Sequence, residues 1–146
     1  LVGMAGEVWR YLPGQVRVIV QWVDWRINLQ VCYDLRFPVF SRNCEDYDLA
    51  LYVANWPTQR QSHWRQLLIA RAIENLACVV GVNRIGTDAR GLSYSGGSLA
   101  VAADGEILLD AHSDNSAFQV VLDGAALQLY RDRFPCQLDA DSFQLQ

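Results

Sequence analysis

Cys32 is the residue of this sequence best placed for covalent chemistry. It follows two segments, 17–22 and 26–31, in which apolar and polar residues alternate at the period of a β-strand. Residues 35–42 predict a short helix with Asp34 as its N-cap. A thiol between a strand end and the first turn of a helix faces free N–H groups, which stabilise the thiolate that attacks a carbonyl carbon. Cys32 is therefore a candidate nucleophile.

The backbone amide of Tyr33 is expected to belong to the same site. An N–H beside the nucleophile can donate a hydrogen bond to the oxyanion that forms on attack, and losing one such donor typically costs about 3–4 kcal/mol of transition-state stabilisation. The competing interpretation is that Cys32 is a buried free cysteine that packs as a small apolar side chain. The local pattern leaves both interpretations open.

Length and composition restrict the class of protein. A chain of 146 residues, 51% of them hydrophobic, amounts to one domain and can bury a core. No apolar run reaches the roughly 20 residues that a membrane-spanning helix needs. The net charge of −4 and the scattered arginines argue against nucleic-acid binding, because phosphates repel an acidic surface. We expect a globular chain with no membrane and no nucleic-acid partner.

The cysteines argue against a disulfide framework and against a metal site. The four cysteines, which show no C-x-x-C spacing, are Cys32, Cys44, Cys78 and Cys136. Such usage suits a reducing, cytoplasmic compartment. With only His63 and His112 in addition, they make a poor set of metal ligands. We expect a cytoplasmic protein without a metal.

The rest of the chain predicts an α/β fold with a mixed sheet and helices on one face. Strands are expected at residues 48–54, 78–83, 98–103, 106–109 and 117–122, helices at 61–76 and 124–133, and a loop at 85–97. Asp104-Gly105 predicts a tight hairpin turn. The continuously apolar run at 48–54 is typical of a strand covered on both faces.

The start of the chain and its apolar strands together predict a missing layer. The sequence begins at Leu1 without a signal peptide, so we expect a fragment whose N-terminal part is missing. Strands as apolar as 49–54 and 78–82 would otherwise expose a broad hydrophobic surface. We expect the N-terminal part, or a second copy of the chain, to cover that face.

Four ordered motifs resemble the carbon–nitrogen hydrolase (nitrilase) superfamily, and within it the bacterial omega-amidases. The motifs are CYDLRFP at 32–38, YVANWP at 52–57, ARAIEN at 70–75 and GVNRIG at 81–86. They follow one another at family spacing over essentially the whole chain. The resemblance implies a nitrilase-like α-β-β-α sandwich, of which residues 1–146 are expected to be the C-terminal portion of one domain, truncated at its N-terminus.

The resemblance also implies a Glu-Lys-Cys catalytic set. Cys32 matches the nucleophile, which forms a thioester with the acyl group of an amide. A second glutamate, which helps to hold the site together, is matched by Glu7 through its distance to Gly14. The family's general-base glutamate and its lysine fall before Leu1. General acid–base help is typically worth about 10² to 10⁴ in rate, so we expect the chain alone to be inactive.

One departure from the resemblance falls at residues 94–98. Omega-amidases of this type tend to carry Arg-Gly-Asp-Ser after a tyrosine, whereas this chain has YSGGS. The change removes two charges from a loop near the expected mouth of the pocket. It concerns substrate preference rather than the type of reaction.

Three residues near Cys32 are candidates for substrate binding. Arg36 can bind a substrate carboxylate, although an arginine in this position beside Asp34 is more often a structural ion-pair partner. Asn55 and Trp56 end the strand that follows Cys32, where α/β sheets gather ligand contacts. For Trp56, pocket lining and plain core packing are both open.

Four other polar residues favour structural roles. Arg71 and Glu74 lie three apart on the predicted helix, and we expect them to pair or to brace the Cys32 helix. A rival Cys–His hydrolase would need His63 within reach of Cys32. The position of His63 at a helix start favours a solvated side chain instead, and His112, in a polar turn, is expected at the surface.

These features predict an omega-amidase-type amidohydrolase. It would hydrolyse small 2-oxo acid amides such as 2-oxoglutaramate to the 2-oxo acid and ammonia, with no metal or organic cofactor. One alternative is another branch of the superfamily, acting on deaminated glutathione or N-carbamoyl compounds, and a second is a non-catalytic remnant or assembly module. The resemblance further implies a homo-oligomer whose partner is a small-molecule amide substrate.

Overall fold

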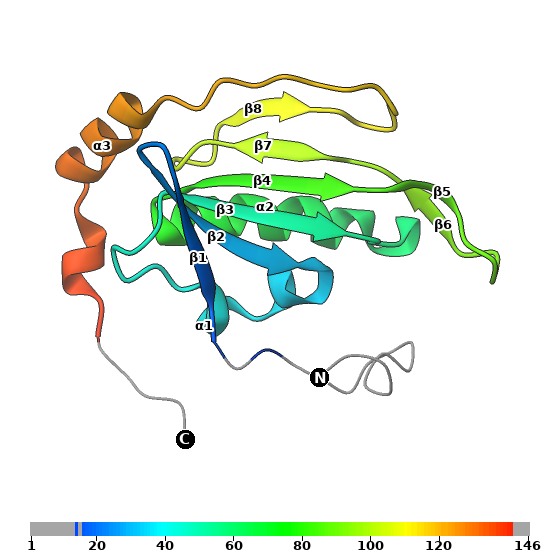
Figure 1. Ribbon diagram of the computed structural model, residues 1–146, viewed down its shortest axis with the longest axis horizontal. Coiled ribbons are helices and arrows are strands. Elements are labelled where there is room, and N and C mark those ends of the chain that lie inside the picture. The colour runs from blue at the N-terminus through cyan, green and yellow to red at the C-terminus, as the bar shows by residue number, and fades with distance from the viewer. Residues whose placement is uncertain (1–13, 15, 142–146) are drawn as a thin grey trace.

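The computed structural model, which describes residues 14 and 16–141, is built around a six-stranded mixed sheet (Figure 1). In spatial order the strands are β1 (Val18–Trp22), β2 (Trp25–Val31), β3 (Leu49–Ala54), β4 (Cys78–Asn83), β7 (Leu99–Val101) and β8 (Ile107–Asp110). The central strands β2, β3 and β4 run parallel, whereas the other pairings are antiparallel. The predicted α/β class with a mixed sheet is confirmed.

Two hairpins extend the sheet, and one of them is the hairpin predicted at Asp104-Gly105. β1 and β2 are joined by a two-residue turn, because Trp22 pairs directly with Trp25. Val23 in that turn has φ 52°, the left-handed conformation that such turns favour. The Asp-Gly turn joins β7 to β8, and Gly105 has φ 92°, which a glycine adopts without a steric cost.

Helix α2 (Gln61–Asn75) covers one face of the sheet, and it lies behind the strands in Figure 1. Its side chains Trp64, Leu68 and Ala72 are fully buried against Ala50 and Val79 of the central strands. The helix ends at Leu76, which takes the left-handed conformation common at helix ends. Both long helices match their predicted bounds closely, since α3 spans Gly124–Arg133.

The helix predicted at residues 35–42 is wrong. The chain instead forms a 3₁₀ turn, η2 (Cys32–Arg36), followed by the short helix α1 (Pro38–Ser41). The break falls at Phe37, with φ −114° and ψ 88°, because a residue that precedes proline is excluded from the helical region. Pro38 then takes the first position of α1, where its missing N–H is not needed.

Two other segments differ from their predictions. The loop at 85–97 contains a small antiparallel hairpin, β5 (Ile85–Thr87) with β6 (Ser93–Ser95). The strand predicted at 117–122 is wrong, because this segment only returns from β8 toward α3 (Figure 1). Its Val121 is 79% exposed. An apolar, β-prone run does not become a strand without a neighbour to pair with.

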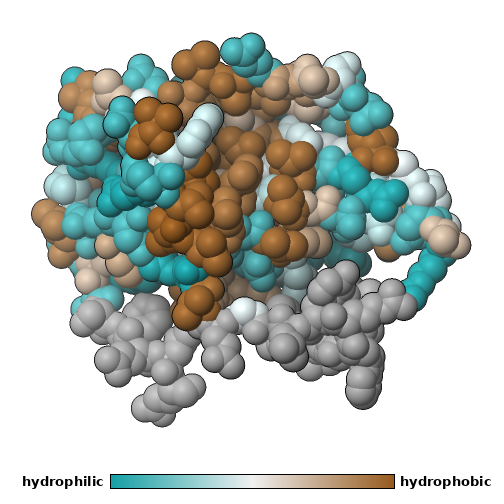
Figure 2. Space-filling view, in the orientation of Figure 1, coloured by the Kyte–Doolittle hydropathy of each residue, from teal (hydrophilic) through white to brown (hydrophobic). Residues whose placement is uncertain are grey.

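The face of the sheet opposite α2 is open among the residues that the structure describes. The exposed apolar side chains on this face are Val18, Val20, Trp22, Leu29, Val31, Val53 and Val82, and Figure 2 shows apolar surface gathered over the middle of the sheet. Of the strand predicted to be covered on both faces, residues 48–54, Ala50 and Tyr52 are buried under α2, while Val53 is 48% exposed among the described residues. Cover of the second face by further chain stays a prediction.

Candidate active site

Cys32 lies directly after β2 with its backbone in the left-handed region, at φ 45°. Such a conformation costs a non-glycine residue on the order of 1–3 kcal/mol and persists only where the surroundings enforce it. Asp34 contributes to that enforcement, because its carboxylate accepts the N–H of Val31 at 2.9 Å and its carbonyl accepts the N–H of Phe37 at 2.9 Å. Cys32 is half-buried in this sharp turn and packs against the hydrophobic core. Strained turns of this kind also present nucleophiles in hydrolases.

The helix N-terminus predicted to stabilise a Cys32 thiolate is absent from this part of the fold. Asp34 is not an N-cap, since it lies inside η2 and binds back to Val31. With five residues in 3₁₀ geometry, η2 is too short to offer an appreciable macrodipole. The N–H of Tyr33 as an oxyanion donor stays a prediction, and the Tyr33 ring packs edge-on against Phe37 with centroids 5.3 Å apart.

The register of the parallel strands brings several chain segments to one edge of the sheet. Val31 pairs with Val53, and Val53 pairs with Val82. The three strands therefore end at the same edge of the sheet, and Cys32 and Asn55 directly follow the ends of β2 and β3. The carboxyl ends of parallel strands are where open α/β sheets place their ligand sites. This carboxyl edge is the candidate active site.

Asn83, which the sequence analysis did not single out, fastens this edge together. Its side-chain carbonyl accepts the N–H of Trp56 at 2.7 Å. Its amide donates to the carbonyls of Trp56 at 3.0 Å and Gly96 at 2.7 Å. The side chain is 6% exposed, so these bonds form in an environment where unmet polar groups are costly. A polar residue at the end of an apolar strand is the signal that could have indicated this role.

Trp56 is a core residue and Asn55 is exposed beside it. The indole of Trp56 is 2% exposed and packs on Trp64 with centroids 5.5 Å apart. Its Nε1 donates to the carbonyl of Arg60 at 2.8 Å. The guanidinium of Arg36 lies 4.8 Å from the centre of the ring. Trp56 therefore supports the site as the ring on which Arg36 stacks. Asn55 is exposed directly after the end of β3.

Arg36 and the two histidines have partners that the sequence did not predict. Arg36 is not an ion-pair partner of Asp34. Its Nη2 lies 3.1 Å from Nδ1 of His63. This contact gives no support to a Cys–His hydrolase, because the exposed His63 ring is directed to Arg36. His112 is confirmed at the surface, with its side chain 80% exposed and Nδ1 3.4 Å from Asp110.

Helix α2 braces the Cys32 turn as predicted. Arg71, 3% exposed, donates from Nη1 to Glu74 at 2.7 Å and from Nη2 to the carbonyl of Leu35 at 2.8 Å. Leu35 is fully buried under the turn. Arg71 thus links the buried face of α2 to η2, so that the helix helps to fix the position of the turn that contains Cys32.

Tyr94, on the β5–β6 hairpin, is a second residue that the sequence analysis missed. Its hydroxyl donates to Asp88 at 3.0 Å, and the guanidinium of Arg84 lies 4.7 Å from the centre of its ring. Burial raises the pKa of Tyr94, the Asp88 carboxylate raises it further, and Arg84 lowers it. Because β5 begins two residues after β4 ends, the hairpin lies at the carboxyl edge of the sheet.

The glycine at position 97 has a steric reason. Gly97 has φ 74°, and a Cβ added there would lie 1.8 Å from Nε2 of Gln61. Gln61 occupies this space because its amide donates to the carbonyl of Gly96 at 3.2 Å and its side-chain carbonyl accepts from Ser95 at 3.2 Å. Gly97, one of the residues that depart from the omega-amidase pattern, therefore leaves the space that Gln61 occupies.

Three features that the sequence analysis considered are a role for Glu7, a metal site and a membrane-spanning helix. Glu7 falls outside the described residues, so its role stays a prediction. Within the described ranges, no group of three or more His, Cys, Asp or Glu side chains could hold a metal ion. No helix described for this chain is long and apolar enough to span a membrane.

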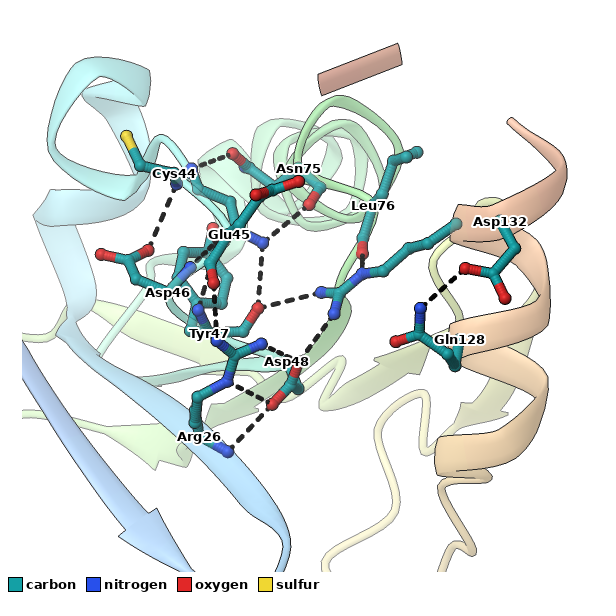
Figure 3. Close-up of polar contacts among 12 residues, drawn as sticks. Arg26, Cys44, Glu45, Asp46, Tyr47, Asp48, Asn75, Leu76, Gln128 and Asp132 are labelled. Atoms are coloured by element: carbon teal, nitrogen blue, oxygen red, sulfur yellow. Dashed lines mark hydrogen bonds and ion pairs between the residues drawn. The ribbon is translucent and has the colours of Figure 1, made fainter. Parts of the chain in front are cut away.

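The opposite, amino edge of the sheet holds a cavity, but its polar groups are already satisfied. Asp48 lies between Arg26 and Arg131, at 2.7 Å from a guanidinium nitrogen of each (Figure 3). Arg131 also donates to the carbonyls of Leu76 and Tyr47, at 2.8 and 2.9 Å. The adjoining cavity of about 420 Å³ is lined by Arg26, Glu45, Gln128, Arg131, Asp132, Pro135, Gln137 and Leu138. With both guanidiniums engaged by the protein, this cavity is not a candidate site.

Comparison with known proteins finds a family model and several relatives that match this chain. The family model described as carbon-nitrogen hydrolase matches residues 3–132. The omega-amidase YafV of Yersinia enterocolitica is 54% identical over 99% of this chain and 57% of its own length. The 2-oxoglutaramate amidase of Paenarthrobacter nicotinovorans is 38% identical over 75% of this chain and 37% of its own length.

The fold also matches a solved structure. The crystal structure of XC1258 from Xanthomonas campestris, a CN-hydrolase superfamily protein with an arsenic adduct in its active site, superimposes with a TM-score of 0.93 and 46% identity. The match covers 97% of this chain and 57% of XC1258, so the chain spans little more than half the length of the relatives it matches. Because the family model covers most of the sequence and its relatives are this similar, the chain belongs to the carbon–nitrogen hydrolase family.

Proposed function

We propose that this chain supplies the nucleophile of an omega-amidase-type amidohydrolase. Its substrates are small 2-oxo acid amides such as 2-oxoglutaramate, and its products are the 2-oxo acid and ammonia. The observation that carries the proposal is Cys32, a partly exposed thiol held in a left-handed turn at the carboxyl edge of parallel strands. The names of two relatives, an omega-amidase and a 2-oxoglutaramate amidase, support the choice of substrate.

In the proposed reaction, Sγ of Cys32 forms a bond to the amide carbon and the π electrons of the carbonyl move onto oxygen. The N–H of Tyr33 donates a hydrogen bond to that oxyanion. The C–N bond then breaks, and the nitrogen takes up a proton and leaves as ammonia. Water attacks the remaining thioester, the C–S bond breaks, and the acid is released with the thiol restored.

Four other residues have proposed roles. Arg36 and Asn55 contact the substrate, and Trp56 holds Arg36 in place through its ring, 4.8 Å from the guanidinium. Glu7 is a supporting carboxylate by resemblance to the family. The proton acceptor and donor match the family's other glutamate and its lysine, which have no counterpart in these 146 residues. We therefore propose that the chain alone does not turn over, that the active enzyme is a cytoplasmic homo-oligomer, and that it needs no cofactor.

The direct test measures ammonia release from 2-oxoglutaramate by the natural-length gene product. C32A is expected to abolish turnover, and mass spectrometry of the wild type quenched in acid is expected to find the acyl group on the peptide that contains Cys32. C44A is the matched control, because Cys44 is an exposed cysteine outside the carboxyl edge. Undiminished turnover by C32A would overturn the proposal. The isolated 146-residue chain is expected to be inactive, and turnover near that of a full-length relative would contradict that part.

Alkylation separates the roles of the cysteines without a substrate. Burial raises the pKa of the Cys78 thiol to about 11, so Cys78 is expected to resist iodoacetamide at neutral pH. Cys32 is only partly buried, so it is expected to react faster than Cys78. Modification of Cys78 in preference to Cys32 would favour the remnant or assembly module over the enzyme. Faster hydrolysis of N-carbamoyl or deaminated-glutathione substrates would favour another branch of the family.

A further inference from the structure

We propose that Arg84 binds the carboxylate of the substrate, so that the site selects amides carrying an acid group at the far end of a short chain. This inference rests on the proposed amidase function and names the residue that would decide its substrate class.

The position of Arg84 follows from the strand register. Its N–H donates to the carbonyl of Ala54 at 3.2 Å, one step beyond the pairing of Ala54 with Asn83. Ala54 in turn lies one step beyond Val53, which pairs with the residue that precedes Cys32. Neighbouring strands are about 4.8 Å apart, so the backbones of Cys32 and Arg84 are separated by roughly 10 Å across the carboxyl edge. A five-carbon monoamide and an arginine side chain together can cover that separation.

The guanidinium of Arg84 is held but not neutralised. It lies 4.7 Å from the centre of the Tyr94 ring, and the side chain is exposed. Five other arginines, Arg17, Arg26, Arg65, Arg71 and Arg131, form ion pairs with carboxylates. Within the described part of the chain, no ion pair involves Arg84. The N–H groups of a guanidinium that stacks on a ring lie in the guanidinium plane, so stacking does not use them. Two of these N–H groups can donate parallel hydrogen bonds to the two oxygens of one carboxylate.

The neighbouring acid acts on this cation without forming an ion pair with it. Arg84 is among the groups that lower the pKa of Asp88, but the oxygens of Asp88 accept the N–H groups of Arg90 and Leu92, each at 2.9 Å, and the hydroxyl of Tyr94 at 3.0 Å. These bonds close the β5–β6 hairpin and fix the ring on which Arg84 stacks. The hairpin thus holds one guanidinium at the carboxyl edge that also contains Cys32.

Arg36 is the other stacked arginine at this edge, and it is less available. Its Nη2 is already 3.1 Å from His63, and its side chain is only partly exposed. Arg36 therefore suits a contact near the thiol, while Arg84 suits the charged end of the substrate.

The test compares two amides of equal length in the natural-length gene product: glutaramate, which carries a carboxylate, and valeramide, which does not. A hydrogen-bonded contact to a charged group is worth enough that R84Q should raise KM for glutaramate about 10- to 100-fold. Turnover of valeramide should change less than about twofold, which also shows that the variant is folded. R84K keeps the positive charge but cannot donate two parallel hydrogen bonds to a carboxylate, so its KM for glutaramate should lie between those of the wild type and R84Q.

The matched control is R90Q, which removes the same charge from the exposed end of the same hairpin. It should leave KM for both amides unchanged. If R84Q slows both amides equally, or if R90Q has the same effect as R84Q, Arg84 is structural or acts only through net charge, and the inference falls while the amidase stands. If the wild type hydrolyses neither amide nor 2-oxoglutaramate, the proposed function fails and takes the inference with it.

Discussion

The two edges of the central sheet use arginine in opposite ways. At the amino edge, Arg26 and Arg131 converge on the single carboxylate of Asp48, and the remaining donors of Arg131 meet backbone carbonyls. At the carboxyl edge, Arg36 and Arg84 lie over the rings of aromatic residues instead of against acids. The first arrangement engages all three guanidinium nitrogens of both arginines with the protein, whereas the second holds each cation without a carboxylate partner among the described residues.

Left-handed backbone does not distinguish the two edges. The carboxyl edge contains Cys32 at φ 45°, and the amino edge contains Glu45 at φ 60° and Leu76 at φ 42°. Such conformations persist where surrounding bonds impose them, as Asp34 does beside Cys32. The edges therefore differ in how they hold arginine: the amino edge pairs it with an acid, and the carboxyl edge stacks it on aromatic rings.

The largest effect on stability is expected from D48A. Removing this carboxylate leaves two guanidiniums without their acid in a region where Asp48 is only 14% exposed, and breaking such a pair typically costs about 3–5 kcal/mol. Urea unfolding, with the m-value checked for two-state behaviour, measures the loss. D46A is the matched control, because the Arg17–Asp46 pair is more exposed and should cost about 1 kcal/mol or less. Equal losses in the two variants would remove the distinction drawn for the amino edge.

The next effect is expected from G97A at the carboxyl edge. The new Cβ would meet the Gln61 amide and would also force a left-handed conformation on alanine, at a combined cost of about 2–4 kcal/mol. G91A isolates the conformational part, because Gly91 also has a positive φ, 79°, but no atom within 4 Å of an added Cβ. Thermal unfolding of both variants measures the difference. If G91A costs as much as G97A, the contact with Gln61 contributes nothing.

The sequence was sufficient for the elements whose signal is local. Alternation, apolar runs and the Asp-Gly turn predicted β1 to β4, the β7–β8 hairpin and both long helices, because each pattern depends on residues close together in the chain. The pairing of Arg71 with Glu74 was predictable for the same reason, since helical spacing brings residues three apart together.

What the sequence missed depends on tertiary partners. The helix predicted at residues 35–42 was wrong because Pro38 keeps Phe37 out of the helical conformation, which the apolar pattern of the segment does not show. Asn83 bonds to residues 13 and 27 positions away, and its place at the end of an apolar strand was the only local sign of this role. Tyr94 contacts Asp88 and Arg84 across a hairpin that the sequence did not predict. The family resemblance identified Cys32 but not the left-handed turn that presents it, because φ is set by hydrogen bonds that only the folded chain forms.

Lowering the pH is expected to reduce the stability that Asp48 contributes at the amino edge. Burial raises the pKa of Asp48, but hydrogen bonds from Arg26 and Arg131 outweigh burial and hold its pKa at about 2. A carboxylate with a lower pKa in the folded than in the unfolded state stabilises the fold above pH 4 and loses that contribution as the pH falls toward 2. The loss is about 2 kcal/mol. Urea unfolding between pH 6 and pH 2.5 should show a steeper decline for wild type than for D48N, and parallel curves would contradict the assignment.

The smallest effect on stability is expected from Y94F. The variant loses one hydrogen bond to Asp88, worth about 1 kcal/mol, while the ring that carries Arg84 remains. Urea unfolding measures this loss, which should be smaller than the losses of D48A and G97A. The phenol of Tyr94 carries no charge at neutral pH, because burial and the Asp88 carboxylate raise its pKa, so Y94F should also leave the alkylation of Cys32 near neutral pH unchanged. A loss as large as that of D48A would mean that the two edges do not differ in what they contribute to stability.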